Sequence, residues 1–371
     1  MIEGTCDVRF ARVREAFREN FSQHAEVGAA VAVHAGGRVV VDLWGGHCDA
    51  ARTRPWREHT LVDVFSVGKG IATLIVLDAV SRGELELDAP VVRYWPKFGA
   101  ADKSAITLRQ VLAHRAGVPA IREPLPRGAG VDAQRMARAL EQQEPWWQPG
   151  ETHGYHVNTF GYLLNELLRR VSGDTIGRRI ARELRASLGA DMYLGLPESE
   201  FARTAEFQFA EWTPPDPAGL SELQLMRRNA YANPIDLSGA GTVNSSGWRQ
   251  AEIPSANLHA TARGVARVYA ALVAGELLPA SLLRDATIEH AQGVDRVLDR
   301  PSRFGLGFQL TQPERPLGPN ATAFGHFGAG GSLGFCDPEA GIAFGYVMNA
   351  MGARWQNPRN RALVDSVYAS L

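Results

Sequence analysis

The stretch FSVGKGIATLIVLDAVSRG, residues 65–83, holds the longest apolar run of the chain and predicts a helix from Ser66 to Arg82. Its apolar side chains lie nearly all the way round that helix, which is typical of a helix buried inside a protein. Gly83 is well placed to end it. The apolar run itself, residues 70–77, is far shorter than the roughly 20 residues that span a bilayer. We therefore expect a helix in the core of a globular protein.

Strand-like patterns occur toward both ends of the chain. The segments AAVAVH (29–34) and RVVVDLW (38–44) flank the pair Gly36-Gly37, which predicts a β-hairpin. Three further strand-like segments follow near the C-terminus: RFGLGFQL (303–310), SLGFCD (332–337) and IAFGYVMN (342–349). Neighbouring strands joined by short turns pair in antiparallel fashion. The two ends of the chain are thus expected to build one antiparallel sheet.

Helical patterns stand between and beside these strands. Residues 8–19 carry apolar side chains near one face, and residues 158–171 follow the i, i+3, i+4, i+7 spacing closely. Asn158 can cap the start of the second helix and Gly173 its end. A closing helix is expected over residues 360–371.

The predicted fold class is therefore α/β (α+β), with a central antiparallel sheet flanked by helices and an inserted helical lobe. We expect residues 1–88 and 175–371 to form a discontinuous sheet domain and residues 89–174 to form the helical lobe. The functional site is expected at the interface between the two.

Composition excludes several classes of protein. The 371 residues are 45% hydrophobic and 21% charged with a formal net charge of −1, which argues against disorder and against a nucleic-acid binder. The first residues lack a basic segment that leads into an apolar stretch, so we infer no export signal and no membrane partner. Three cysteines without zinc-ligand spacing, which cannot all pair, are typical of a cytoplasmic protein. Neither a metal nor an organic cofactor is implied, and the oligomeric state is left open.

Lysine is rare in this chain. Of 39 basic residues only three are lysines, Lys69, Lys97 and Lys103, and the other 36 are arginines. Arginine cannot be deprotonated in a protein, whereas a buried lysine can. Lys97 and Lys103 stand in polar, loop-like settings and are expected on the surface. Lys69 lies on the predicted buried helix, where its ammonium group needs an explanation.

Ser66 and Lys69 are spaced i and i+3 at the start of that helix, which places both side chains on one face. Free backbone N–H groups and the positive end of the helix dipole at the same point favour a developing anion. A serine hydroxyl becomes a nucleophile when a base takes its proton, and a lysine can be that base when burial lowers its pKa. By itself the spacing also fits a helix-capping serine and a lysine that reaches the surface.

The wider sequence context favours the catalytic interpretation. Further motifs follow in order: Leu112-Ala113-His114-Arg115-Ala116-Gly117, then Pro149-Gly150 with Tyr155 before the helix at 158–171, and finally Gly325-His326-Phe327-Gly328-Ala329-Gly330-Gly331. Together with Ser66-x-x-Lys69 they resemble the serine β-lactamase and penicillin-binding-protein superfamily. They look most like the class C β-lactamase-like esterases called family VIII carboxylesterases. The resemblance covers about residues 25–350.

The resemblance implies a role for each matching residue. Ser66 would be the acylated nucleophile, Lys69 its base partner, and Tyr155 the group that passes protons to the leaving group and from the deacylating water. The backbone N–H groups of Ser66 and Ala329 would form the oxyanion hole. The segment His326–Gly328 would lie on an edge strand beside the site.

Departures from the β-lactamase pattern favour an ester substrate. The second motif reads Tyr155-His156-Val157, where β-lactamases have Tyr-x-Asn, and Asn158 comes one position later. The third motif reads His-Phe-Gly in place of Lys-Thr-Gly, so the ammonium that would hold a β-lactam carboxylate is missing. His326, Phe327 and Gly328 are expected to bind substrate.

Other aromatic and histidine residues lie near these motifs. His156, Trp146 and Trp147 are candidates to line an acyl or alcohol pocket, although lobe packing explains the tryptophans equally well. His153-x-x-His156 is expected to be a loop feature rather than a metal site.

Ser332 lies in Gly330-Gly331-Ser332-Leu333-Gly334, which matches the Gly-x-Ser-x-Gly nucleophile elbow of α/β-hydrolases. That motif needs a strand, a sharp turn and then a helix. Here a strand-like segment follows Ser332 and no histidine comes after it to complete the triad. Ser332 is therefore expected to be structural.

The sequence thus predicts a serine carboxylesterase that hydrolyses small, short-acyl esters through an acyl-Ser66 intermediate. Within the same site, alternatives are a β-lactamase or D-amino-peptide hydrolase, and an acyltransferase that uses an alcohol or amine in place of water. A non-catalytic ligand-binding module of the penicillin-recognising type is an alternative of another class. The complete set Ser66, Lys69 and Tyr155 argues against that last alternative.

Overall fold

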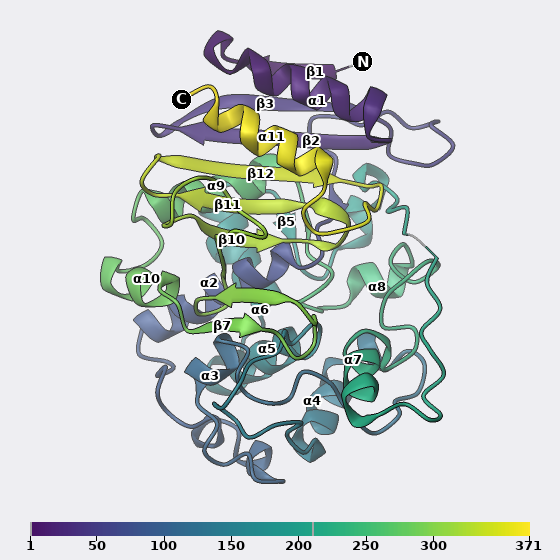
Figure 1. Ribbon diagram of the computed structural model, residues 1–371, viewed down its shortest axis with the longest axis vertical. Coiled ribbons are helices and arrows are strands. Elements are labelled where there is room, and N and C mark those ends of the chain that lie inside the picture. The colour runs from purple at the N-terminus through teal and green to yellow at the C-terminus, as the bar shows by residue number, and fades with distance from the viewer. Residues whose placement is uncertain (1, 210) are drawn as a thin grey trace.

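A nine-stranded antiparallel sheet forms the centre of the computed structural model, which describes residues 2–209 and 211–371. Its strands come from both ends of the chain, as expected (Figure 1). In spatial order they are β1 (Ile2–Cys6), β3 (Arg38–Gly46), β2 (Gly28–Ala35), β12 (Ile342–Met348), β11 (Leu333–Asp337), β10 (Phe324–Phe327), β9 (Gln309–Leu310), β8 (Pro301–Phe304) and β7 (Ala291–Val294). A second, three-stranded sheet has the order β4 (Val62–Asp63), β6 (His259–Ala260) and β5 (Met192–Tyr193).

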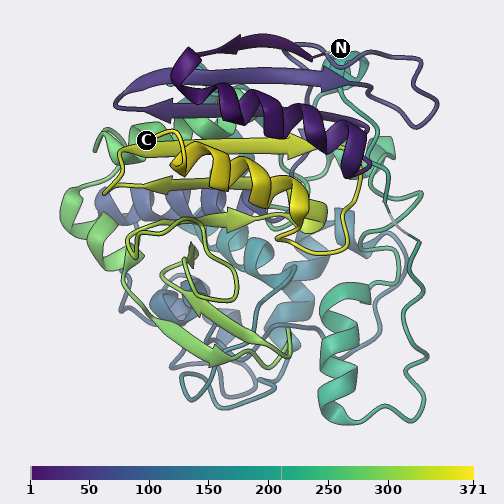
Figure 2. The same ribbon diagram turned by 45° about the horizontal axis from the view of Figure 1, so that its top comes forward.

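Helices cover both faces of the large sheet. α1 (Ala11–Gln23) and α11 (Pro358–Tyr368), from opposite ends of the chain, lie side by side on one face (Figures 1 and 2). α2 (Val67–Ser81) and α9 (Ala262–Val273) pack on the other face. The remaining helices are α3 (Leu108–Leu112), α4 (Ala133–Gln142), α5 (Thr159–Ser172), α6 (Ile176–Arg179), α7 (Glu222–Ala232), α8 (Ser246–Gln250) and α10 (Ala280–Thr287).

The helix predicted from residues 65–83 is confirmed as α2. It packs against β10 on one side and against α5 on another. Residues from Val67 to Leu77 are all buried, which explains why the apolar positions run nearly round the whole helix. Among the described residues, no helix is long and apolar enough to cross a membrane.

A pair of glycines lets α9 lie directly on the sheet. Gly334 of β11 and Gly345 of β12 are cross-strand partners. A Cβ at Gly345 would lie 2.4 Å from the carbonyl oxygen of Ala262, and one at Gly334 would lie 2.6 Å from side-chain atoms of Val265 and Tyr269. Any larger residue in either position would push α9 away from the sheet.

The N-terminal helix prediction was wrong at its start. Residues 2–6 form edge strand β1, paired with β3, and α1 begins only at Ala11 after a short turn capped by the side chain of Asp7. Val8, which the pattern placed on the apolar face, is 89% exposed. The apolar pattern does not reveal that Val8–Phe10 form a separate 3-10 turn, which the Asp7 side chain caps and which leaves Val8 exposed.

Three smaller expectations also need correction. The segment 303–310 is two short strands, β8 and β9, rather than one. β10 is not an edge strand, since β9 pairs with Phe324 and Gly325 on the side away from β11. The side chain of Asn158 does not cap α5 but donates to the carbonyl of Ala230.

Lys103 is buried, which contradicts the expected surface position, whereas Lys97 is exposed as predicted. The Lys103 ammonium donates to the carbonyl oxygens of Ala100, Glu141 and Gln143 at 2.7, 3.0 and 2.6 Å. Two of these carbonyls lie at the C-terminal end of α4, where a cation satisfies the unpaired carbonyls. Sequence context could not show this because the partners lie about forty positions away.

We predict that Lys103→Met lowers the free energy of unfolding by roughly 2–4 kcal/mol, since it leaves three carbonyl groups without their donor. Lys97→Met is the matched control, because it makes the same chemical change on the surface and should change stability by about 0.5 kcal/mol or less. Urea denaturation followed by circular dichroism measures both. Equal effects of the two substitutions would contradict a structural role for Lys103.

Candidate active site

Ser66 lies at the junction between β4 and α2. The preceding residue, Phe65, has a φ of 47°, in the left-handed region that bulky residues rarely adopt. The backbone N–H of Phe65 donates to the Asp63 carboxylate at 2.8 Å, which holds this sharp turn. Ser66 is the N-cap of α2 and its side chain is only half-buried. The turn therefore presents the hydroxyl at the positive end of a buried helix.

The Lys69 amine lies one turn further into the core. Its Nζ is 3.0 Å from Ser66 Oγ and 2.9 Å from the carbonyl oxygen of Ser255. The side chain has no exposed surface, and no carboxylate among the described residues lies within ion-pair distance of it. Burial lowers the pKa of Lys69 well below its ordinary value. A neutral amine in this position can accept the serine proton.

Tyr155 completes a cluster around Ser66. Lys69 Nζ lies 4.8 Å from the centre of the Tyr155 ring, and the ring is almost fully buried. Its hydroxyl makes no hydrogen bond within the part of the chain that the structure describes. Burial raises the pKa of Tyr155 well above its usual value, and the nearby Ser66 hydroxyl opposes that rise. The phenol is therefore protonated at neutral pH and free to donate.

Asp295, which the sequence analysis did not identify, holds the backbone of Tyr155. Both carboxylate oxygens of Asp295 accept the Tyr155 N–H at 3.0 Å. The same buried carboxylate accepts from the N–H groups of Val297 and Leu298 and from the Ser302 hydroxyl, which also bonds His153 at 2.8 Å. No local motif marks an aspartate that acts 140 residues away on a backbone N–H.

Two histidines of the predicted motifs also fix the Tyr155 segment. The His114 carbonyl accepts from Gly154 N–H, and His114 Nδ1 accepts from His156 N–H at 3.2 Å. In His156, Nδ1 bonds the Gly154 carbonyl and Nε2 accepts from Val118 N–H. Both ring nitrogens of His156 are thus occupied by backbone groups, and neither is left to contact a substrate.

The backbone N–H groups of Ser66 and Ala329 make no hydrogen bond to other described residues. Ala329 lies in the turn between β10 and β11. Ser332 Oγ donates to the carbonyl of Val64 at 2.9 Å and so ties this turn to the chain just before Ser66. A Cβ at Gly328 would lie 2.0 Å from Ser332 Oγ and 2.3 Å from the Val64 carbonyl oxygen, so only glycine allows this close approach. The prediction that Ser332 precedes a strand is confirmed.

The N-terminal end of α11 holds the same turn from the opposite side. Asn357 and Arg359 donate to the Gly330 carbonyl at 2.9 and 3.2 Å, and Asn360 donates to the Gly331 carbonyl at 2.8 Å. Arg359 in turn pairs with buried Glu26 at 2.8 Å. Side chains from the last helix and from the segment before β2 therefore fix the position of Ala329.

His326 occupies the position of the family's lysine and is electrically neutral. It is fully buried, its Nδ1 bonds the Phe327 carbonyl at 2.7 Å, and its ring centre lies 6.0 Å from that of Tyr155. Burial and the adjacent Lys69 lower the pKa of His326 to about 3. Phe327 is buried beside it and its N–H donates to the Gln309 side chain. This strand therefore places no positive charge next to Ser66.

Aromatic rings surround Tyr155. Phe304 stacks on it with ring centres 5.8 Å apart, and Trp355 meets it edge-on at 5.1 Å. Trp147 packs in the same cluster beneath Gly154. Trp146 is half-buried, donates to the Ala120 carbonyl and carries the Arg122 guanidinium 3.7 Å above its ring. Phe304 and Trp355 were not predicted, because neither lies in a recognisable motif.

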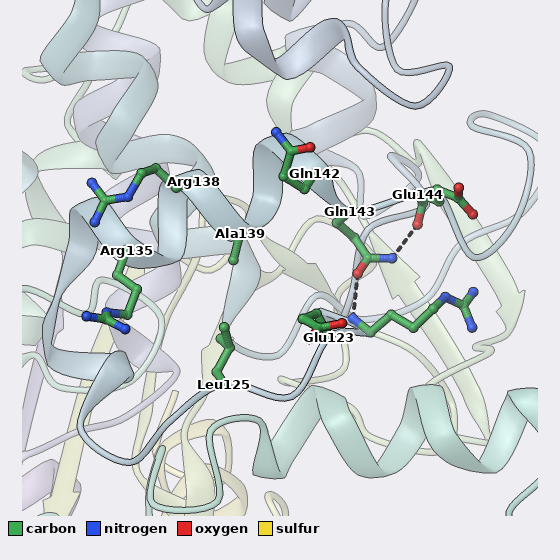
Figure 3. A pocket seen from close by; sticks show the side chains of 9 residues that line it. Glu123, Leu125, Arg135, Arg138, Ala139, Gln142, Gln143 and Glu144 are labelled. Carbon is green, nitrogen blue, oxygen red and sulfur yellow. Dashed lines mark hydrogen bonds between the residues drawn. The ribbon is translucent and has the colours of Figure 1, made fainter.

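A cavity of about 760 Å³ shares Arg122 with the contacts just described but does not reach Ser66 (Figure 3). The residues that line it are Arg122, Glu123, Leu125, Arg135, Arg138, Ala139, Gln142, Gln143 and Glu144. Three arginines and two glutamates give this hollow a mixed charge, and it contains none of Ser66, Lys69 or Tyr155. In residues 2–209 and 211–371, no group of three or more His, Cys, Asp or Glu side chains is arranged to hold a metal ion.

Comparisons with known proteins agree on one family. The Beta-lactamase family matches residues 13–369. Esterase/beta-lactamase LipL of Mycobacterium tuberculosis is 34% identical over 365 residues, which cover 94% of this chain and 83% of LipL. A crystal structure described as a penicillin-binding protein homolog from Caulobacter crescentus superposes with a TM-score of 0.92 at 37% identity, and one described as a family VIII carboxylesterase with 0.91 at 36%. Both superpositions cover 100% of each chain.

The fold agrees with these matches, since both structural neighbours superpose on the chain from end to end. The family match spans nearly the whole sequence, and the alignment with LipL covers more than two thirds of both proteins. This protein therefore belongs to the Beta-lactamase family.

Proposed function

We propose that this protein is a serine carboxylesterase that hydrolyses small, short-acyl esters through an acyl-Ser66 intermediate. The observation that carries the proposal is the contact of 3.0 Å between Ser66 Oγ and a fully buried Lys69 amine without a carboxylate partner. A lysine that served only as a surface cation would not be placed there, because burying an unpaired ammonium is very costly. The esterase names of LipL and of the carboxylesterase neighbour support the same reaction class.

The proposed acylation step uses the contacts around Ser66. Ser66 Oγ attacks the ester carbonyl carbon while Lys69 Nζ accepts the hydroxyl proton, and the carbonyl oxygen becomes an oxyanion held by the N–H groups of Ser66 and Ala329. When the tetrahedral adduct collapses, the C–O bond to the alcohol breaks. Tyr155 donates a proton to the departing alkoxide and regains one from the Lys69 ammonium. The products of this half-reaction are the free alcohol and acyl-Ser66.

Deacylation repeats these steps with water. As a water molecule attacks the acyl carbonyl, its proton passes to Tyr155 while Tyr155 gives its phenol proton to Lys69 Nζ. The Lys69 ammonium then returns a proton to Ser66 Oγ as the acid leaves. An alcohol or amine in place of water would give acyl transfer at the same site. Neutral His326, beside Lys69 and Tyr155, favours an ester without a negative charge at that position over a β-lactam whose carboxylate needs a cation there.

The free thiols of Cys6, Cys48 and Cys336 support a cytoplasmic location for the protein.

We predict that Ser66→Ala lowers kcat/KM for p-nitrophenyl acetate by about 10³-fold or more, because it removes the nucleophile. Ser332→Ala is the matched control: it removes a hydroxyl that supports the Ala329 turn but leaves the nucleophile, so kcat/KM should fall far less than in Ser66→Ala. Mass spectrometry after treatment with a fluorophosphonate should place the adduct on the peptide that contains Ser66. An adduct on Ser332, or full activity of Ser66→Ala, would refute the proposed nucleophile.

Lys69→Arg tests whether the amine acts as a base. Arginine carries a permanent positive charge and cannot be deprotonated, so we expect a loss of about 10²- to 10⁴-fold in kcat/KM, the scale of general-base catalysis. In the unmodified protein, kcat/KM should fall as the pH is lowered through the pKa of Lys69, because protonation removes the base. In Lys69→Arg the residual kcat/KM should not show this fall as the pH is lowered. A variant with most of its activity would mean that Lys69 serves only as a fixed charge.

Asp295 is expected to act as a positioning residue for Tyr155. Asp295→Asn replaces one acceptor oxygen by an amide that cannot accept, so Tyr155 should donate less effectively to the leaving group. We predict that kcat/KM for ethyl butyrate falls about tenfold more than that for p-nitrophenyl butyrate, because p-nitrophenolate leaves without a proton. Asp299→Asn, an exposed neighbour paired with Arg227, should leave the ratio of the two rates unchanged. Equal losses for both esters in Asp295→Asn would show a merely structural effect.

A further inference from the structure

Two arginines without carboxylate partners lie next to the aromatic cluster of the active site. The Arg300 guanidinium carbon lies 4.8 Å from the centre of the Trp355 ring, and that of Arg315 lies 6.0 Å from it. Trp355 itself contacts the Tyr155 ring at 5.1 Å. Three separate loops, before β8, after β9 and before α11, therefore converge at Trp355, which contacts the Tyr155 ring.

Neither guanidinium forms an ion pair with another described residue, while Arg315 donates to the Pro301 carbonyl at 2.6 Å and is partly offset by the charges of Glu314 and Asp295. Several other buried or half-buried arginines lie within 4.0 Å of a carboxylate, among them Arg109, Arg179, Arg203, Arg263, Arg303 and Arg359. Arg300 and Arg315 have no such ion pair to another described residue. The buried Nε of Arg300 has no hydrogen-bond partner there either. The nearby Asp295 carboxylate is already occupied by Tyr155, Val297, Leu298 and Ser302.

The two arginines also affect each other. Burial and the adjacent positive charge of Arg300 lower the pKa of Arg315 to about 10. Two like charges in a partly desolvated place repel each other, and an anion bound between them would relieve that repulsion. Arg315 lines a small cavity of about 10 Å³ together with Phe304, which stacks on Tyr155, and Phe327 of β10.

We propose that Arg300 and Arg315, stacked on Trp355, bind a carboxylate carried by the alcohol part of the ester substrate. The planar guanidinium group matches a carboxylate through paired hydrogen bonds. This inference rests on the proposed esterase function, in which Tyr155 donates to the leaving alcohol. The alcohol part therefore lies beside Tyr155, whose ring contacts Trp355, the tryptophan over which both guanidinium groups lie. The positive charge that is missing at His326 is thus supplied by Arg300 and Arg315, which lie over Trp355.

A matched pair of substrates tests the proposal. 4-Acetoxybenzoate and its methyl ester have the same acyl group and aromatic leaving group, but only the first carries a carboxylate. We expect the ratio of their kcat/KM values, anionic over neutral, to fall about tenfold or more in the double variant Arg300→Gln/Arg315→Gln. Each single variant should show part of this fall, which keeps the test valid should the double variant fail to fold. An unchanged ratio would overturn the proposal.

Arg227→Gln is the matched control, because Arg227 lies close by but is paired with Asp299 at 2.7 Å. Its anionic-to-neutral ratio should equal that of the unmodified protein. An equal fall in Arg227→Gln would point to a general effect of charge on the surface and would overturn the specific role of Arg300 and Arg315.

Calorimetry separates this proposal from the esterase function itself. In a Ser66→Ala background, 4-acetoxybenzoate should bind about tenfold more weakly after Arg300→Gln/Arg315→Gln, whether or not turnover occurs. Unchanged affinity would overturn the carboxylate site even if both esters are hydrolysed. Failure of the unmodified protein to hydrolyse either ester would overturn the esterase function, and a loss of affinity in the calorimetric experiment would still support the anion site.

Discussion

Burial of the Lys69 amine beside Ser66 is the constraint on which the arrangement of the site depends. An ammonium group without a carboxylate partner is costly to bury, so the protein favours the neutral amine, which is the form that can accept a proton. The burial arises because α2 lies between the sheet and α5. The Ser255 carbonyl gives the amine its second contact, and the Ser255 hydroxyl accepts from Gly161 of α5. The packing of the core thus sets the chemistry of the lysine.

The groups around Ser66 are held by independent supports from distant parts of the chain. The turn at Phe65 places Ser66, the Asp295 carboxylate holds the Tyr155 backbone, and Ser332 with the N-terminal end of α11 holds the turn that contains Ala329. Rigid supports of this kind matter because donors and acceptors must already be aligned when charge develops in the transition state.

Charge is distributed unevenly across the proposed site. Beside Lys69 and Tyr155 the strand offers a neutral imidazole, whereas two guanidinium groups without ion-pair partners lie over Trp355. Neutral His326 suits an uncharged ester group, and the positive charges of Arg300 and Arg315 suit an anionic group elsewhere on the same substrate. Substrate choice within a fold shared by esterases and β-lactamases would then depend on where the cation lies relative to the nucleophile.

The sequence by itself determined the local features: the hairpin around Gly36-Gly37, the buried helix after Ser66, the helix before Gly173 and the spacing that brings Lys69 beside Ser66. Each depends on contacts between residues close in the chain, so periodicity and turn residues reveal it. The order of the motifs also indicated the fold class. The tertiary structure alone decided that residues 2–6 pair as an edge strand, that Lys103 is buried against carbonyls of α4, and that Asp295 supports Tyr155. These features depend on partners far away in the sequence, whose proximity exists only after the chain has folded.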